Sequence, residues 1–378
     1  MYQGDFVRRL ETMGGERRHN PLRVDFGLLI LLLILCTAGL FVLYSASEQN
    51  MAYIRRQAMI MAAGFFGLLV VAQFPVRFWE RWAFVLYSGA LLSLLAVLLF
   101  GVEAKGATRW LDLGFTRFQP SEITKIAVPM MVSAYLSKRL IPPSPKHVAG
   151  ALLVVLVPVL AIFNQPDLGT AILVFASGFF VLFLAGLKKR YLVGTSLSAL
   201  AAAPILWLYV LRDYQKQRVL TLLSPEDDKF GAGWNIIQST TAIGSGGLTG
   251  KGWTQGTQSQ LNFLPESHTD FIIAVLAEEF GLIGVIALCV LYLLIIGRCM
   301  IIALGAQSQF GRLMAGSISL TFFIYIFVNM CMVSGLLPVV GVPLPLISHG
   351  GTAILTLFFG FGIVMAISSE PRRIGTGL

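Results

Sequence analysis

The sequence predicts an all-α integral membrane protein with ten transmembrane helices and a large extracytoplasmic loop between helices 7 and 8. The first observation is composition: of 378 residues, 56% are hydrophobic and 12% are charged, whereas soluble domains have about 25% charged residues. The second is that apolar residues come in runs near the roughly 20 residues that a helix needs to cross the hydrocarbon core. The third is that only one polar connection is long. The mean hydropathy of +0.78 agrees with this class.

Ten apolar runs define the predicted helices. The first run is too long for the apolar core of a signal peptide, so we expect it to remain in the membrane. The fourth and fifth runs are the shortest. The predicted ranges are 25–46, 57–74, 79–102, 122–137, 148–163, 169–187, 190–210, 270–297, 312–333 and 350–368.

The positions of Lys and Arg predict the side of the membrane that each loop faces, because basic residues are enriched in short cytoplasmic loops. With the N-terminus inside, most basic residues lie on the cytoplasmic side, and the short outer loops hold Arg55, Arg56, Lys105, Arg109 and Arg117. We therefore expect cytoplasmic segments at 1–24 and 369–378 and a membrane domain at 25–368. This distribution explains the net charge of +9 and gives no indication of nucleic-acid binding.

The predicted loop 211–269 is about 60 residues long, well beyond an ordinary connection. It contains apolar residues such as Trp234 and Trp253, which favour a folded segment over a disordered one. Its stretch "NIIQSTTAIGSGG" fits an amphipathic helix. "GSGGLTGKGW" resembles a phosphate-binding loop, but Lys251 is followed by Gly252 and no strand precedes it. We expect tight turns there, with the alternative that its backbone N–H groups hold a diphosphate.

Three connections carry candidate polar residues. In "FQPSEITK", Glu122 and Lys125 are three residues apart at a helix start and can pair on one face; a structural ion pair and a role in binding are both open. "NQPDLGT" favours a turn, with Asp167 capping the next helix. "VVGVPLPLISHGG" contains two prolines and suggests a re-entrant segment, in which His349 could titrate near neutral pH. The cysteines lie in or beside apolar runs with no metal-ligand spacing.

The stretch "SHTDFIIAVLAEEFG" places three carboxylates at the outer end of the eighth predicted helix. Asp270 is either a helix-start acid favoured by the helix dipole or a partly desolvated general base. Glu278 and Glu279 are consecutive, so they cannot both point at one partner. Basic residues of the outer loops could bind an anionic lipid head group; these are Arg109, Lys216, Arg218 and Lys251.

Motifs along nearly the whole chain resemble one family. They include "KGATRWLDLG", "FQPSEITKIAVP", "NQPDLGT", "DYQKQRVLTLLSPEDD", "GTQSQLNFLPESHTDFIIAVLAEEFG" and "LPVVGVPLPLISHGG". In this order they resemble the SEDS family (shape, elongation, division and sporulation), and its RodA-like elongation members more than its division members. One departure is His349, where many relatives carry Tyr.

The resemblance implies a peptidoglycan glycosyltransferase that polymerises lipid II during cell elongation and rod-shape maintenance, in the bacterial cytoplasmic (inner) membrane with its site on the periplasmic side. It implies that Asp270 deprotonates the acceptor 4-hydroxyl, which attacks the donor anomeric carbon and expels undecaprenyl diphosphate. Cations must then stabilise the phosphate charge. The candidate substrate-binding residues are Arg109, Glu122, Lys125, Arg218 and Lys251.

The resemblance also implies a partner, a class B penicillin-binding protein that crosslinks the product as a transpeptidase. No resident metal is expected, although a divalent cation, Mg²⁺ or Mn²⁺, could accompany the diphosphate. The alternative from another class is a lipid II flippase, which needs polar residues near the membrane midplane; Asn329 and Ser334 are the candidates. A third alternative is a scaffold whose acids only cap helices.

Overall fold

The computed structural model describes residues 23–371 except 105–106, 113, 115–116, 229–230 and 261–265. Almost all of the predicted segment 1–24, most of the tail 369–378, and Lys105 and Phe263 therefore lie outside the described residues. Each of the ten predicted ranges overlaps a helix. These helices are α2 (Phe26–Ala46), α3 (Met51–Gln73), α4 (Val76–Phe100), α5 (Pro120–Ser137), α6 (Pro145–Asn164), α7 (Leu168–Leu184), α8 (Lys189–Ile205), α12 (Ile272–Gly305), α13 (Gln309–Val333) and α14 (Thr352–Ser368).

The length and apolarity of these helices identify a multi-pass membrane protein. In the part of the chain that is described, six helices are long and apolar enough to cross a membrane, namely α2, α3, α4, α6, α12 and α13. Helices α7 and α14 are apolar but have 17 residues each. Large apolar side chains on the outer faces of the bundle are exposed, among them Phe66, Leu99 and Ile283, as expected for surfaces that contact lipid tails.

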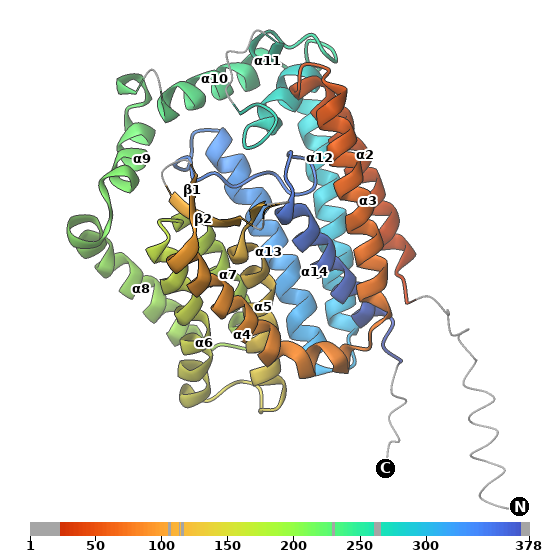
Figure 1. Cartoon of the computed structure of the whole chain (residues 1–378), viewed down its shortest axis with the longest axis vertical. Helices are drawn as coiled ribbons and strands as arrows, with labels where there is room; N and C mark the ends of the chain where they lie inside the picture. The colour runs from red at the N-terminus through yellow and green to blue at the C-terminus, as the bar shows by residue number, and fades with distance from the viewer. Residues whose placement is uncertain are drawn as a thin grey trace, which may run out of the picture.

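Local sequence signals set several helix starts. Asp25, Asn50, Asp167 and Ser308 each accept a hydrogen bond from a backbone N–H in the first turn of the following helix, which satisfies groups that a helix leaves unpaired. The predicted cap at Asp167 is thus confirmed. Helix α8 continues into a π-helical turn at Leu206–Val210 and lies at the edge of the bundle in Figure 1.

Close packing joins segments that are far apart in sequence. Helix α3 packs along α14, α4 along α5, and α12 along both α2 and α13. Two glycines allow the close approach of α3 and α14. A Cβ at Gly64 would lie 2.2 Å from the ring of Phe358, and one at Gly362 would lie 2.8 Å from Val71. The core of the bundle is therefore built from both ends of the chain.

The structure departs from the predicted all-α class at one connection. Between α4 and α5, strands β1 (Val102–Ala104), β2 (Ala107–Asp112) and β3 (Arg117–Phe118) form a small antiparallel sheet in the order β1-β2-β3. The segment is too short and too polar to cross a membrane, and pairing it with itself satisfies its backbone groups. This sheet carries Arg109 to the bundle.

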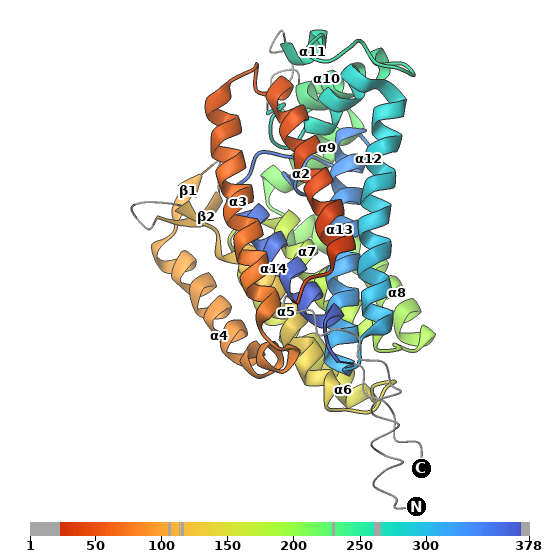
Figure 2. The same cartoon turned by 90° about the vertical axis from the view of Figure 1, so that its right-hand side faces the viewer.

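The long loop contains helices of its own. These are α9 (Asp213–Leu223), a 3₁₀ turn (Pro225–Asp227), α10 (Ala232–Ser245) and the short α11 (Thr257–Gln260), so the helix predicted in "NIIQSTTAIGSGG" is confirmed. Figures 1 and 2 show α10 and α11 at one end of the molecule, opposite the start of α2 and the end of α14, and in Figure 1 α9 runs along the left side between α10 and α8. The predicted tight turns are also confirmed, because Gly247, Gly250 and Gly252 have positive φ.

Candidate functional site

Asp270 lies in a turn that immediately precedes α12. The helix begins at Ile272 with Phe271 as its cap residue and no capping side chain, so Asp270 is not a helix cap. Its backbone oxygen accepts a hydrogen bond from Asn329 Nδ2 of α13 at 2.8 Å. Thr269, one residue earlier, accepts one from Ser348 Oγ at 2.5 Å. The turn is therefore held by α13 and by the segment before α14, and the Asp270 side chain is half-buried beside Gly341.

Two arginines share the electrostatic environment of Asp270. Burial lowers the pKa of Arg218, with Arg109 acting in the same direction, whereas Tyr214, Asp167 and Asp270 oppose the shift. Arg218 lies over the ring of Tyr214, 5.7 Å from its centroid. The structure thus brings together α9, the β2 strand and the start of α12, three segments that are remote in sequence.

The "NQPDLGT" turn fixes the position of these groups. Arg109 Nη2 donates to the backbone oxygen of Pro166 at 3.1 Å, and Tyr214 Oη donates to the same oxygen at 2.8 Å. Arg109 Nε lies 3.7 Å from Asp167 Oδ2. Sequence reasoning treated this motif as structural and missed Asp167 and Tyr214 as neighbours of the arginines. The motif itself was the available signal for Asp167, but no pattern in the sequence pointed to Tyr214.

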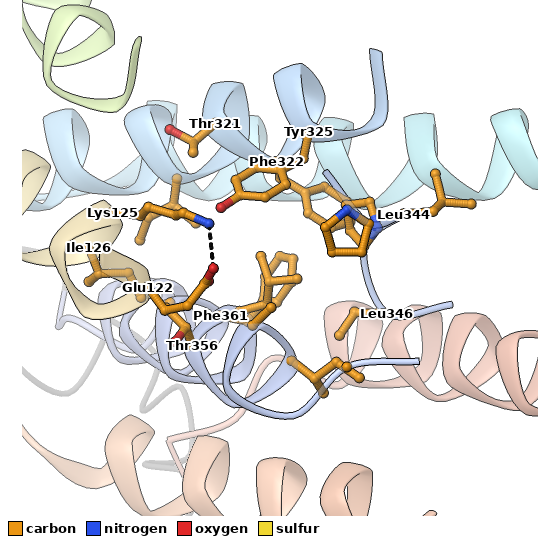
Figure 3. Close-up of a pocket in the computed structure, with 18 of the residues that line it drawn as sticks. Glu122, Lys125, Ile126, Thr321, Phe322, Tyr325, Leu344, Leu346, Thr356 and Phe361 are labelled. Atoms are coloured by element: carbon orange, nitrogen blue, oxygen red, sulfur yellow. Dashed lines mark hydrogen bonds and ion pairs between the residues drawn. The ribbon is translucent and has the colours of Figure 1, made fainter. Parts of the chain in front are cut away.

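Glu122 and Lys125 form the predicted pair, with Lys125 Nζ 2.7 Å from Glu122 Oε1. Both side chains are buried at the N-terminal start of α5. Lys125 Nζ also lies 4.8 Å from the ring centroid of Tyr325, on α13. Figure 3 shows these three side chains together at one side of a cavity. Tyr325 could not be identified from the sequence, because nothing distinguishes it from an ordinary buried aromatic residue.

The cavity lies between α5, α13, α14 and the segment 343–350. Apart from the Glu122–Lys125 pair and Tyr325, its lining is mainly apolar (Figure 3). Ser348, which also lines it, bonds the backbone beside Asp270. A polar end next to an apolar interior suits a ligand that has both a charged head and a hydrocarbon part.

Lys251 lies in a different environment from the other candidate cations. Its Nζ is 2.7 Å from Glu278 Oε1, and the Glu278 side chain is fully buried. The backbone N–H groups of Gly250, Lys251 and Gly252 donate to the oxygens of Gly246, Glu278 and Glu279. The N–H groups of Lys251 and Gly252 thus attach the turn to α12 and that of Gly250 bonds within the loop, which disfavours the alternative that these groups hold a diphosphate.

Asn329 and the segment 339–351, both singled out from the sequence, have structural roles. Asn329 is buried and donates to the backbone oxygens of Asp270 and Val342. The segment 339–351 contains no helix or strand and packs among the helices, in agreement with the predicted re-entrant segment. Across the described ranges, no three His, Cys, Asp or Glu side chains gather into a group that could hold a metal ion.

Comparison with known proteins identifies the family. Residues 26–373 match the model of the FtsW, RodA and SpoVE family of cell cycle proteins. The chain belongs to this family. It is 53% identical over 356 residues to the peptidoglycan glycosyltransferase MrdB of Escherichia coli, covering 94% of this chain and 96% of MrdB. It is 37% identical to a probable peptidoglycan glycosyltransferase FtsW of Trichlorobacter lovleyi, with the same coverages.

Solved structures of the family share the fold. RodA of Thermus thermophilus superposes with a TM-score of 0.70 at 28% identity, covering 91% of this chain and 96% of RodA. A chain of a peptidoglycan synthase complex that coordinates polymerization and crosslinking superposes with a TM-score of 0.81 at 30% identity, covering 91% of this chain and 97% of that chain. The predicted SEDS resemblance is confirmed.

Proposed function

We propose that this protein polymerises lipid II into glycan strands on the outer side of the cytoplasmic membrane, with Asp270 as the general base. That the chain is a peptidoglycan glycosyltransferase follows from family membership and from 53% identity to MrdB over almost its whole length. The substrate, the side of the membrane and the roles of individual residues are the proposal. The observation that carries it is that Asp270, on a turn held by Asn329 and Ser348, interacts electrostatically with Arg218 of α9.

The proposed reaction is a displacement at the anomeric carbon of the donor sugar. Asp270 takes the proton of the acceptor 4-hydroxyl, the hydroxyl oxygen forms the new bond to the anomeric carbon, and the bond to the diphosphate breaks. The electron pair of that bond leaves with the diphosphate, so negative charge increases on the phosphate oxygens. A half-buried carboxylate on a rigid turn suits a general base, and the hydrogen bonds to Asn329 and Ser348 hold that turn in place.

The leaving diphosphate needs fixed positive charge close to the base. Arg218 and Arg109 supply this positive charge. Pro166 and Asp167 hold Arg109 in place. Lys125 supplies a further charge at the polar end of the cavity, where Glu122 orients it. A divalent ion, Mg²⁺ or Mn²⁺, accompanying the diphosphate would add to this positive charge. Lys251 is bound to Glu278, and its geometry favours a structural role.

A transpeptidase partner and the membrane arrangement complete the proposal. One structural relative is part of a synthase complex that coordinates polymerization and crosslinking, which supports an association of this chain with a class B penicillin-binding protein. Each of the ten predicted spans overlaps a helix, an even number that would put both termini on one side, and the basic residues of the short loops favour the cytoplasm for that side.

Replacing Asp270 by Asn tests the assignment. We expect Asp270→Asn to lower polymerisation of lipid II by the purified protein and its partner by about 10²-fold or more, because a general base contributes roughly that factor. The matched control is Asp213→Asn, an exposed acid on α9, which should keep wild-type activity. Full polymerisation by Asp270→Asn would contradict the assignment. Wild-type protein that moves lipid II head groups across the bilayer but makes no polymer would instead support the flippase alternative.

A further inference from the structure

A cluster of polar rings forms around His268, two residues before Asp270 in the same turn. The ring of Tyr53, near the start of α3, lies 5.3 Å from the rings of both His268 and His349, and the two imidazoles are 6.2 Å apart. The backbone oxygen of His268 accepts a hydrogen bond from the N–H of His349 at 2.9 Å. The cluster is therefore joined to the turn that carries the proposed base.

One face of α3 organises this cluster. Tyr53, Arg56 and Gln57 are three and four residues apart and so lie on one side of the helix. The buried Gln57 donates to the backbone oxygen of Ser348 at 3.1 Å and accepts from the N–H of Gly350 at 3.4 Å. It holds the backbone on both sides of His349. Arg55 is two residues after Tyr53 and therefore does not share this face of the helix.

The cluster is basic and incompletely paired. Burial lowers the pKa of His349, and His268 and Arg56 act in the same direction. Its Nδ1 is buried and has no hydrogen-bond partner among the described residues. A buried polar atom without a partner is uncommon and calls for an explanation. Protonation that burial and a nearby arginine disfavour in the free protein becomes favourable once an anion lies beside the imidazole.

The reaction proposed above requires two anions, because the donor and the acceptor are both lipid-linked diphosphates. Only the donor loses its diphosphate, so only that group gains charge in the transition state. Permanent cations such as Arg109 and Arg218 suit the donor. The acceptor keeps its diphosphate, whose charge does not change during the reaction. A site for this group therefore needs only to bind it, without added stabilisation of the transition state. In Figure 1, α9 and α3 lie on opposite sides of the molecule.

We propose that Arg56, His268 and His349, arranged around Tyr53, bind the diphosphate of the acceptor substrate on the side of Asp270 opposite Arg218. This assignment rests on the proposed function. Arg56 supplies the permanent charge, the imidazoles supply N–H donors, and the shared turn sets the distance between the bound diphosphate and the base. The bound diphosphate thereby fixes which hydroxyl of the acceptor reaches Asp270.

The test is a comparison of Arg56→Gln with Arg55→Gln, both exposed arginines of α3. Each full-length variant is reconstituted with its partner transpeptidase in nanodiscs of neutral phosphatidylcholine, and KM and kcat for lipid II are measured. We expect Arg56→Gln to raise KM about tenfold, because a hydrogen bond to a charged group contributes roughly that factor. Its kcat should stay within about twofold, since binding that is equal in ground and transition states affects KM alone. Arg55→Gln should match wild type.

The titration of His349 gives an independent readout. Tyr53 and Arg56 of α3 and His268 of the turn face this ring. A bound diphosphate raises the imidazole pKa above its lowered value in the free protein, so binding takes up a proton and KM for lipid II rises as the pH increases above the pKa of the free imidazole. His349→Gln keeps a hydrogen-bond donor but cannot titrate, and it should reduce this slope.

Several outcomes would overturn the proposal. One is an Arg56→Gln variant with the same KM as Arg55→Gln; another is an unchanged pH slope in a folded His349→Gln variant. A third is a defect of Arg56→Gln that appears only when anionic phospholipid is added to the nanodiscs, because the ligand would then be a bulk lipid head group. Polymer formation by wild-type protein, and its loss in Asp270→Asn, test the proposed function separately.

Discussion

Glu278 and Glu279 are adjacent and almost fully buried, yet they bind different segments of the chain. Glu278 accepts hydrogen bonds from Lys251 Nζ at 2.7 Å and from the backbone N–H of Gln258 at 2.9 Å. Glu279 accepts one from Ser45 Oγ of α2 and others from backbone N–H groups of the loop. Together they attach the segment 246–260 to α12 and α2, in the part of α12 that follows the turn carrying Asp270.

Removing the partner of Glu278 should therefore destabilise the loop. We expect Lys251→Met to lower the free energy of unfolding by about 2 kcal/mol, because it leaves a buried carboxylate without its counter-charge; the partial exposure of Lys251 keeps the cost below that of a fully buried pair. The measurement is the thermal unfolding midpoint in detergent. Adding Glu278→Gln should restore part of the loss, and Lys188→Met, at an exposed lysine, should change little. A Lys251→Met midpoint equal to wild type would contradict this role.

Residue pairs were predictable where the chain brings them together locally. The Glu122–Lys125 pair follows from helical spacing, and the divergence of Glu278 and Glu279 follows from their adjacent positions. Pairs between distant segments were not predictable: Arg109 with Asp167 and Lys251 with Glu278 depend on how the loop and the sheet fold onto the bundle. The sequence consequently identified the candidate cations but did not separate Lys251 from the arginines near Asp270.

Helix α12 is divided by Gly281, whose φ of 63° and ψ of −160° are non-helical. The sequence predicted one continuous span from 270, because apolar residues continue through this position. The kink turns the backbone so that Leu282 and Ile283 donate to the oxygens of Gly247 and Leu248. A Cβ at Gly281 would lie 2.4 Å from the backbone nitrogen of Gly250. Glycine is therefore required on both steric and conformational grounds.

Substitution at the kink should detach the loop from the helix. We expect Gly281→Ala to cost roughly 2–4 kcal/mol through strain and the clash with Gly250, and to reduce lipid II polymerisation because the turn at Asp270 loses support. Gly297→Ala is the matched control in the same helix, since a Cβ there meets nothing within 4 Å; it should be neutral or slightly stabilising. Equal unfolding midpoints for the two variants would show that the kink is not needed to hold the loop.

For the molecule as a whole, the sequence predicted the helices well because each must satisfy its backbone internally within the membrane, and long apolar runs have few alternatives. The spatial arrangement of those helices and their packing were not predictable. Contacts such as that of α3 with α14 depend on the fit of particular side chains, for example Phe358 against Gly64. The small sheet was also missed, since strands of two to six residues carry too little periodicity to be recognised.

Orientation in the membrane is a property of the whole chain and can be tested directly. The loop helices lie at one end of the molecule and the connection between α12 and α13 at the other, and the distribution of Lys and Arg places the loop outside. In a variant whose four native cysteines are replaced by Ala, Thr249→Cys, at an exposed loop position, should react with a membrane-impermeant maleimide in spheroplasts. Gln307→Cys, exposed between α12 and α13, should react only after the membrane is permeabilised. The reverse pattern would place Asp270 on the cytoplasmic side, where a polymerase of the outer wall could not use it.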